Sequence, residues 1–122
     1  MPDYPRRRTP ERHLPLTVPV FQILLSLSDQ SLHGYAIIQD IRDRTGSEVS
    51  LTASTLYAAI ARLLESRLIE ELDTRPGPDD DDQRRRYYAI TPAGKDVVRL
   101  EMGRLERMLR SARQKKLTPR KA

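Results

Sequence analysis

The chain has 122 residues, two histidines, no cysteine and a formal net charge of +5. This length fits one ordinary domain with a modest core and leaves no room for a second. Without cysteine there are no disulfides and no thiolate metal sites, and His13 and His33 are too far apart in the sequence to suggest a histidine metal cluster. We therefore predict a single domain with no metal and no cofactor.

An arginine-rich start followed by an apolar stretch, residues 14–27, superficially resembles a secretion signal. Pro15, Pro19 and Gln22 interrupt that stretch, and no small-residue cleavage site follows it. No uninterrupted apolar run approaches the roughly 20 residues that a membrane-spanning helix needs. These features predict a soluble, cytoplasmic protein with no membrane partner.

The positive charge is concentrated at the two ends of the chain. Residues 1–16 carry a net charge of +2 and residues 104–122 carry +7, which leaves −4 for residues 17–103. A basic protein is a candidate for nucleic-acid binding. Because the central part is acidic overall, such binding has to depend on individually placed residues there.

Apolar periodicity predicts two helices in the first third of the chain. Residues 1–16, with four prolines, are predicted to be a basic, unpacked tail. Apolar residues then recur at helical spacing over residues 18–27, and again over residues 33–45, where a glycine supplies the stop. Val49 and Leu51 alternate around a serine and predict a short strand before the next helix.

The third predicted helix, residues 53–67, has a cap and two chemically different faces. Thr52 is a good N-cap, because its hydroxyl can accept from the unpaired amides of the first turn. At about 100° per residue, one side carries the apolar residues Leu56, Ile60, Leu63 and Leu64. The opposite side and its borders carry mostly small, hydroxyl-bearing or basic residues together with one acid, and they are Ser54, Thr55, Tyr57, Ala58, Ala61, Arg62 and Glu65.

A helix with this second face is suited to the major groove of DNA. Short side chains let the backbone approach the base edges, while hydroxyl and guanidinium groups donate to phosphates and bases. The alternative interpretation is an ordinary surface helix that is rich in alanine and serine. The segments that follow favour the DNA-reading interpretation.

Two predicted strands, residues 68–73 and 84–90, enclose a loop with two prolines and a glycine, which is typical of a long hairpin or wing. Arg84, Arg85 and Arg86 begin the second strand and are followed by two tyrosines. Because side chains alternate along a strand, we expect at least one of these arginines to face away from the core, towards a DNA backbone or groove. The alternative is an edge strand that charge protects from aggregation.

Four consecutive acids, Asp79 to Asp82, lie in the wing loop and would repel phosphates. We expect them to be solvated, with the tip directed off the duplex or paired with the basic tails. A calcium loop is the alternative, but the run lacks the spaced oxygen ligands and central glycine of an EF-hand. The base of the wing, rather than its tip, is therefore the predicted contact.

The last predicted helix is capped by Thr91, has Pro92 at its first position and runs to about Lys116. Five of its apolar residues alternate at spacings of four and three, which is the pattern of a coiled-coil seam: Val98, Met102, Leu105, Leu109 and Ala112. A domain of this size rarely covers such a seam, so we predict that the same helix of a second subunit does so in a homodimer. The alternative is packing on the first helix of the same chain.

Together these elements predict an α+β fold that is mainly α. It consists of a winged helix-turn-helix domain over residues 17–91, a C-terminal dimerisation helix over residues 92–116, and a disordered basic tail over residues 117–122. Double-stranded DNA is the predicted partner of such a fold.

The chain resembles the PadR family of bacterial transcriptional regulators over about residues 17–101, through the strings LSLSDQSLHGYAIIQDIRDRTG, LTASTLYAAIARLLESRLIEEL and RRRYYAITPAGK. The resemblance implies a winged helix-turn-helix domain, a dimerising C-terminal helix, operator binding that usually represses, and release by a small effector in some members. The single terminal helix is similar to the shorter branch of the family. By motif, the resemblance assigns DNA contacts to Tyr35, Ser54, Thr55, Tyr57 and Arg84 to Arg86.

Two features depart from the family pattern. The acidic wing tip argues against insertion of that tip into the minor groove, and the arginine-rich N-terminal tail offers a replacement contact of the kind that basic arms make.

The sequence contains no catalytic constellation that competes with this interpretation. It has no glycine-rich phosphate loop, and its serines and histidines lack a convincing third partner, so we expect that it is not an enzyme. The predicted function is a dimeric DNA-binding repressor, with a small-molecule effector at the dimer interface as a further predicted partner. The alternative is a dimeric winged-helix adaptor that binds proteins and has lost DNA binding.

Overall fold

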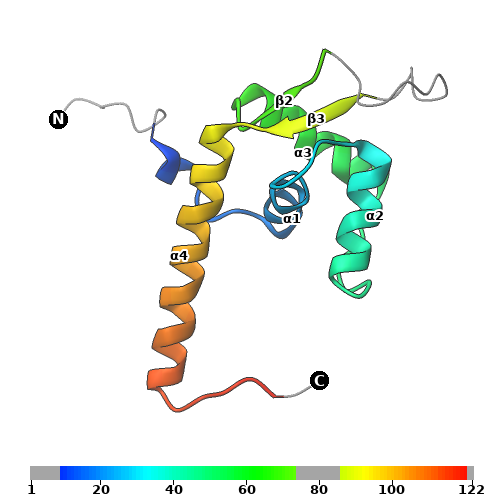
Figure 1. Ribbon diagram of the computed structural model, residues 1–122. Helices are drawn as coiled ribbons and strands as arrows, with labels where there is room; N and C mark the ends of the chain where they lie inside the picture. Colours follow the sequence, from blue (N-terminus) through cyan, green and yellow to red (C-terminus); the bar gives the residue numbers. More distant parts are fainter. Residues whose placement is uncertain (1–8, 74–85, 121–122) are drawn as a thin grey trace.

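The four α-helices and the two strands of the hairpin follow one another in the predicted order. The computed structural model describes residues 9–73 and 86–120. In those ranges the elements are the 3-10 helix η2 (Pro10–His13), α1 (Val18–Ser26), β1 (Leu32–His33), α2 (Gly34–Arg44), α3 (Ala53–Glu65), β2 (Ile69–Glu71), β3 (Tyr87–Ile90) and α4 (Pro92–Gln114). Figure 1 shows the first three α-helices gathered beside the upper half of α4, with the sheet above them. The predicted mainly helical α+β fold is confirmed.

Each of the described α-helices begins at a side chain that caps it. Thr17, Thr52 and Thr91 accept a hydrogen bond from the amide three residues further on, over 3.3, 3.1 and 3.1 Å respectively. His33 does the same for α2, with its Nδ1 accepting from the amide of Ala36 over 3.1 Å. The caps satisfy amides that have no partner inside the helix, and so fix where each helix starts.

A single apolar core holds α1, α2, α3 and the sheet together. It is built from the inward faces of the helices, with Ile23 and Leu24 from α1, Ile37 and Ile41 from α2, Leu56, Ile60 and Leu63 from α3, and Val97 and Val98 from α4. The predicted apolar face of α3 is therefore the face that packs inwards, which leaves its polar face outside. No helix of the described residues is long and apolar enough to cross a membrane.

Arg44, in the last turn of α2, fixes that helix on α1. Its guanidinium donates to Asp40 Oδ2 over 2.8 Å, to Gln22 Oε1 over 2.9 Å and to Ser26 Oγ over 2.8 Å. Burial acts to raise the pKa of Asp40, but the hydrogen bonds from Arg44 and Ser26 outweigh it and leave that pKa below its ordinary value. This network sets how the two helices before α3 lie against each other.

The sheet has three antiparallel strands in the order β1-β3-β2, and its first strand does not lie where the sequence predicted. Leu32 and His33 pair with β3, whereas Val49 and Leu51 belong to no strand. The amide of Val49 instead donates to Thr45 Oγ1 over 3.0 Å. The prediction of a strand at Val49 and Leu51 was therefore wrong. Thr45, the C-cap residue of α2, already accepts the hydrogen bond of the Val49 amide.

One carbonyl joins α3, the hairpin of β2 and β3, and α4. Leu68 O, three residues after the end of α3, accepts from the amide of Thr91 over 3.0 Å, and the Thr91 hydroxyl proton is shared between Leu68 O at 3.0 Å and Arg67 O at 2.8 Å. A Cβ on Gly94 would lie 2.2 Å from the same oxygen, so only glycine permits this approach of α4. The hydroxyl of Thr91 also caps α4 through Gly94, which makes this junction both a helix start and a strand contact.

Residues 9–16 differ from the predicted unpacked tail, because they lie against α4. Leu14 and Leu16 pack on the core, and the amide of Leu16 donates to Glu101 Oε2 over 3.0 Å. Glu101 is only 2% exposed and pairs with Arg104 over 2.5 Å. The hydrogen bond from Arg104 outweighs burial and, with the amide of Leu16, lowers the pKa of Glu101. A buried carboxylate thus anchors a segment whose composition alone suggested a tail.

Replacing Glu101 with glutamine is expected to lower the free energy of unfolding by about 1.5–3 kcal/mol near pH 7, because a hydrogen-bonded buried charge is lost. The folded-state pKa of Glu101 is depressed, so this contribution is present above the unfolded pKa and is lost as the pH falls through the folded value. Urea denaturation should therefore separate wild type from variant at neutral pH and bring them together well below about pH 4.3. Glu106→Gln, an exposed change on the same helix, is the control. An equal difference at both pH values would contradict the assignment.

Candidate nucleic-acid interface

The outer face of α3 carries the residues that the sequence assigned to DNA. Ser54, Thr55, Ala58 and Arg62 are all exposed. The amide and the hydroxyl of Thr55 both bind the hydroxyl of Thr52 over 3.1 Å, which places the first turn of α3 in a defined geometry. The exposed side chains of this turn include those of Ser54 and Thr55, which are small and polar, and close approach to a groove requires such groups.

Tyr57 links α3 to the start of α2. Its ring lies over Gly34, where a Cβ would come within 2.2 Å of the tyrosine hydroxyl oxygen. Tyr35, the next residue of α2, is 65% exposed, and Tyr57 is 49% exposed. Two predicted contact residues from different helices are therefore brought to one surface, and Gly34, which sequence reasoning did not single out, makes their approach possible.

At the base of the wing, one arginine is exposed and the two tyrosines that follow it are buried. Arg86 is exposed, whereas Tyr87 and Tyr88 are both buried. The two tyrosines that follow the arginines pack inwards, because Tyr88 joins the core and the ring of Tyr87 packs edge-on against His33 with centroids 5.3 Å apart.

Three other predicted wing features lie outside the described residues. They are the arginines at positions 84 and 85 and the acidic run Asp79 to Asp82. Arg86 is thus the wing cation whose surroundings the structure describes.

Tyr88 lies near the two halves of the candidate interface. Burial, Glu71 and Tyr57 raise its pKa, and Arg86 acts in the opposite direction. Tyr57 also packs over Gly34, and the residue before Gly34, His33, pairs in the sheet with Tyr87, which directly follows Arg86. The outer face of α3, the start of α2 and the base of the wing form one surface, which we call the reading face: Tyr35, Ser54, Thr55, Tyr57, Ala58, Arg62 and Arg86.

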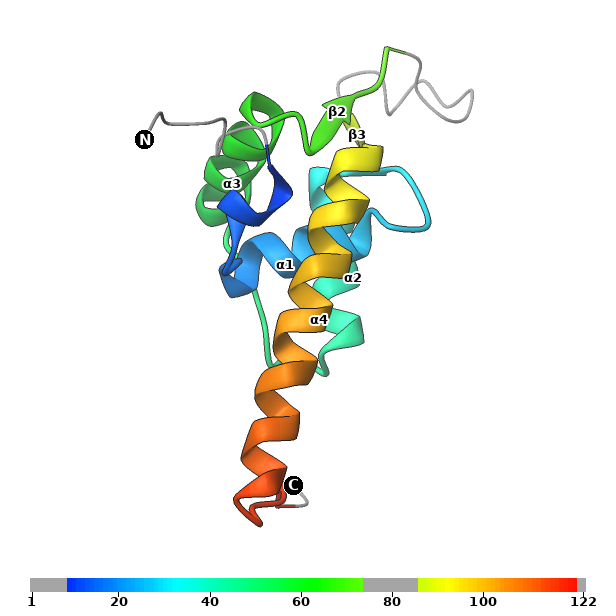
Figure 2. The same ribbon diagram turned by 90° about the vertical axis from the view of Figure 1, so that its left-hand side faces the viewer.

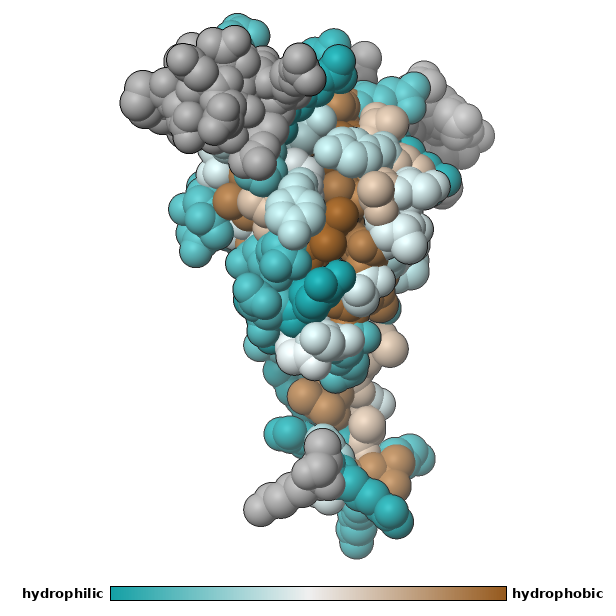
Figure 3. Space-filling view, turned by 90° about the vertical axis from the view of Figure 1, so that its right-hand side faces the viewer, coloured by the Kyte–Doolittle hydropathy of each residue, from teal (hydrophilic) through white to brown (hydrophobic). Residues whose placement is uncertain are grey.

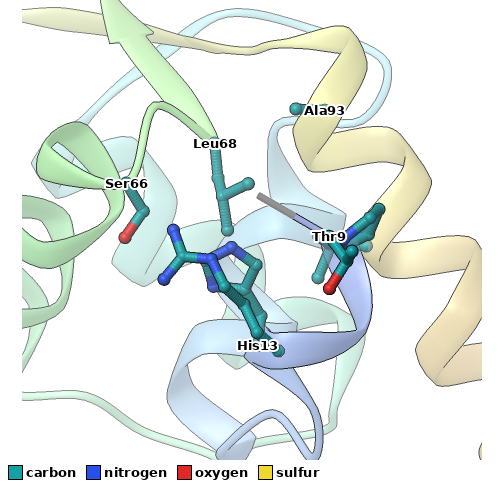
Figure 4. Close-up of a pocket in the computed structure, with 8 residues that line it drawn as sticks. Thr9, His13, Ser66, Leu68 and Ala93 are labelled. Atoms are coloured by element: carbon teal, nitrogen blue, oxygen red, sulfur yellow. The ribbon is translucent and has the colours of Figure 1, made fainter. Parts of the chain in front are cut away.

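A hollow lies between the N-terminal segment and the end of α3, bordering the reading face at Arg62. Two adjoining cavities of about 260 and 200 Å³ share His13, Ser66 and Leu68 in their walls. Figure 4 shows Thr9 and Ser66 on opposite sides, with His13 and Leu68 between them. Burial and the neighbouring Arg12 lower the pKa of His13, which favours its neutral form. This hollow, unlike the predicted effector site, lies within one chain.

The second half of α4 extends beyond the rest of the chain and exposes apolar side chains. Figure 2 shows this part below the other helices, and Figure 3 shows hydrophobic atoms among hydrophilic ones on the same protruding part. Met102, Leu105 and Leu109 are exposed and Ala112 is half-buried, whereas Val98 is only 6% exposed and lies in the core of its own chain. Val98 is therefore a core residue, because α4 packs on α1 at this level, and the uncovered seam starts at Met102.

Replacing Gly34 with alanine is expected to weaken binding to a promoter duplex while changing the melting temperature little. The new methyl group occupies the place of the Tyr57 hydroxyl, and the flexible ring can move away at small cost to the fold. Fluorescence anisotropy with labelled duplex and thermal denaturation measure the two effects. The loss should match that of Tyr57→Ala and should not add to it in the double variant. Additive losses would show that Gly34 does not act through Tyr57.

Comparison with known proteins places the chain in a family. The model of the Transcriptional regulator PadR-like family matches residues 23–100, which is more than half of the chain. A protein in a transposon of Streptomyces fradiae is 33% identical over 86 residues, covering 70% of this chain and 22% of its own length, so the chain spans about a fifth of that relative.

Two solved structures share the fold. A transcriptional regulator from Clostridium thermocellum has a TM-score of 0.67 at 27% identity, covering 79% of this chain and 87% of its own. Bacillus subtilis PadR in complex with operator DNA has a TM-score of 0.58 at 25% identity, covering 70% and 46%. Because the family model matches more than half of the chain, the chain belongs to the PadR-like family of transcriptional regulators.

Proposed function

We propose that this chain is a dimeric repressor that places α3 in the major groove and sets the base of its wing on the DNA backbone. The observation that carries the proposal is the reading face, where Tyr35 of α2, Tyr57 of α3 and Arg86 before β3 are all exposed and their elements meet at Gly34 and His33. The similarity to Bacillus subtilis PadR, solved in complex with operator DNA, supports the same use of the fold.

The chemistry of the reading face fits a division between base and backbone contacts. Ser54, Thr55 and Ala58 are small enough to let the backbone of α3 approach base edges, while Arg62 and Arg86 at its margins can reach phosphates. Because residues 17–103 carry a net charge of −4, general attraction to DNA is weak there. Affinity then depends on these few placed cations and on the basic segments at the chain ends.

Replacing Arg86 with alanine is expected to weaken duplex binding several-fold and to reduce the slope of log K against log salt by about 1, because one phosphate contact is lost. Fluorescence anisotropy with the upstream promoter duplex, over a range of salt concentrations, measures both quantities. Arg99→Ala is the matched control, since Arg99 is an exposed arginine on α4 that pairs with Asp96. A wild-type chain without salt-dependent duplex binding would refute the proposal and favour a protein-binding adaptor.

Dimerisation through α4 is the second part of the proposal, and the uncovered seam of Met102, Leu105 and Leu109 supports it. A second copy of α4 offers the same seam, so a two-fold axis buries both. A two-fold dimer also presents two copies of α3 at the roughly 34 Å spacing of successive major grooves. The domain boundaries at residues 91 and 116 remain predictions.

Leu109→Glu is expected to convert a dimer into a monomer, because the introduced carboxylate would be buried in the seam. Light scattering after size-exclusion chromatography gives the mass directly. Ser111→Glu adds the same charge on the opposite side of α4 and should leave the dimer intact. The monomer is expected to lose operator affinity, since only one reading face then engages. A wild-type chain that is monomeric at micromolar concentration would contradict this part.

Release of the DNA on binding of a small-molecule effector is the third part of the proposal, and the hollow beside His13 is the candidate effector site. Its walls combine the apolar Leu68 and Val97 with the hydroxyl of Ser66, a mixture that suits small ligands. Ser66 caps α3, and Arg62 of the reading face lines the adjoining cavity. A ligand held there contacts the end of the recognition helix directly, which is how binding would act on DNA affinity.

A further inference from the structure

A negative charge, Glu71, lies beside the wing cation of the reading face, Arg86. Glu71 Oε2 lies 3.9 Å from Arg86 Nε. In the register of the hairpin Glu71 is opposite Tyr88, and Arg86 precedes Tyr88 by two residues, so Glu71 and Arg86 share one face of the sheet. Sequence reasoning found the arginine and missed its partner, because the two residues are 15 positions apart.

This ion pair is poorly placed to stabilise the fold. The side chain of Arg86 is 71% exposed and that of Glu71 is 43% exposed. Exposed pairs of this kind contribute little to stability, since water screens both charges. The same exposure leaves the guanidinium open to a phosphate, which would have to take the place of the carboxylate. The pair is thus more relevant to binding than to folding.

We propose that Glu71 is a positioning residue that holds Arg86 at the base of the wing and lowers DNA affinity by competing with phosphate for its guanidinium. The proposal rests on the proposed function. When DNA binds, Arg86 exchanges a carboxylate for a phosphate, and the displaced carboxylate stays close to the DNA backbone and repels it. Both effects act on the backbone contact, so they weaken binding to all duplexes about equally.

Glu71→Gln removes the competing charge and keeps the shape of the side chain. We expect about three- to tenfold tighter binding, equal for the promoter duplex and for a scrambled duplex of the same length. The slope of log K against log salt should steepen by up to about 0.9, because Arg86 then neutralises a phosphate without first losing a protein partner. Anisotropy titrations over a range of salt concentrations measure both.

Glu70→Gln is the matched control, because Glu70 is exposed on the same strand but faces the other side of the sheet. It makes the same change in net charge one residue away, so it measures the general effect of charge. The second control repeats Glu71→Gln in an Arg86→Ala background. There the gain should shrink to that of Glu70→Gln, because no guanidinium is left to release.

The outcomes separate this inference from the function on which it rests. Wild-type binding together with equal gains from the two glutamine variants would overturn the role of Glu71 and leave the repressor proposal standing. A gain that persists without Arg86 would also overturn it, since the carboxylate would then act only through general charge. If neither wild type nor Glu71→Gln binds any duplex, both proposals fail together. Tighter binding that requires Arg86 supports both.

Discussion

The arrangement of the whole molecule depends on one backbone oxygen, Leu68 O. It accepts a hydrogen bond from the amide of Thr91, shares the Thr91 hydroxyl with Arg67 O, and lies where a side chain on residue 94 would otherwise be. Leu68 lies between the end of α3 and the start of β2, and Thr91 is the N-cap residue of α4. The contact between them therefore ties α3, the hairpin of β2 and β3, and α4 together. A relative rotation of these elements would have to break bonds that are partly buried, so they are expected to move as one body.

That rigidity determines what the reading face can do. Arg86 directly precedes β3, at the end of the strand away from Thr91. The contact between Thr91 and Leu68 therefore sets the position of the wing relative to α3. The opposite end of the body is fixed separately, since Glu101 holds the amide of Leu16 and so positions the segment that leads into α1. On the α4 side, Gly94 makes the first of these contacts and Glu101 makes the second. This helix therefore supports both the reading face and the uncovered seam.

The sequence predicted well the features that depend on local patterns and poorly those that depend on distant partners. Helix starts at Thr52 and Thr91, the inward face of α3 and its exposed residues follow from caps and periodicity. The strand at Leu32 and His33 was missed, because two residues give no period and its pairing partner lies in the wing. The burial of Val98 depends on α1, and the role of Glu71 depends on a strand 15 residues away. Composition likewise suggested a tail where Glu101 provides an anchor.

A reading face with few cations has a consequence for assembly. Arg62 and Arg86 are the described cations of that face, and Glu71 offsets part of the second. Each phosphate contact adds only a modest increment to affinity, so under the proposed function one such face would bind a duplex weakly at physiological salt. In the proposed dimer, joining two faces through the α4 seam would make the second contact intramolecular and would multiply affinity without any further cation. A weakly binding single face would also release non-matching DNA quickly, so the acidic central part and the proposed dimer would both favour specificity.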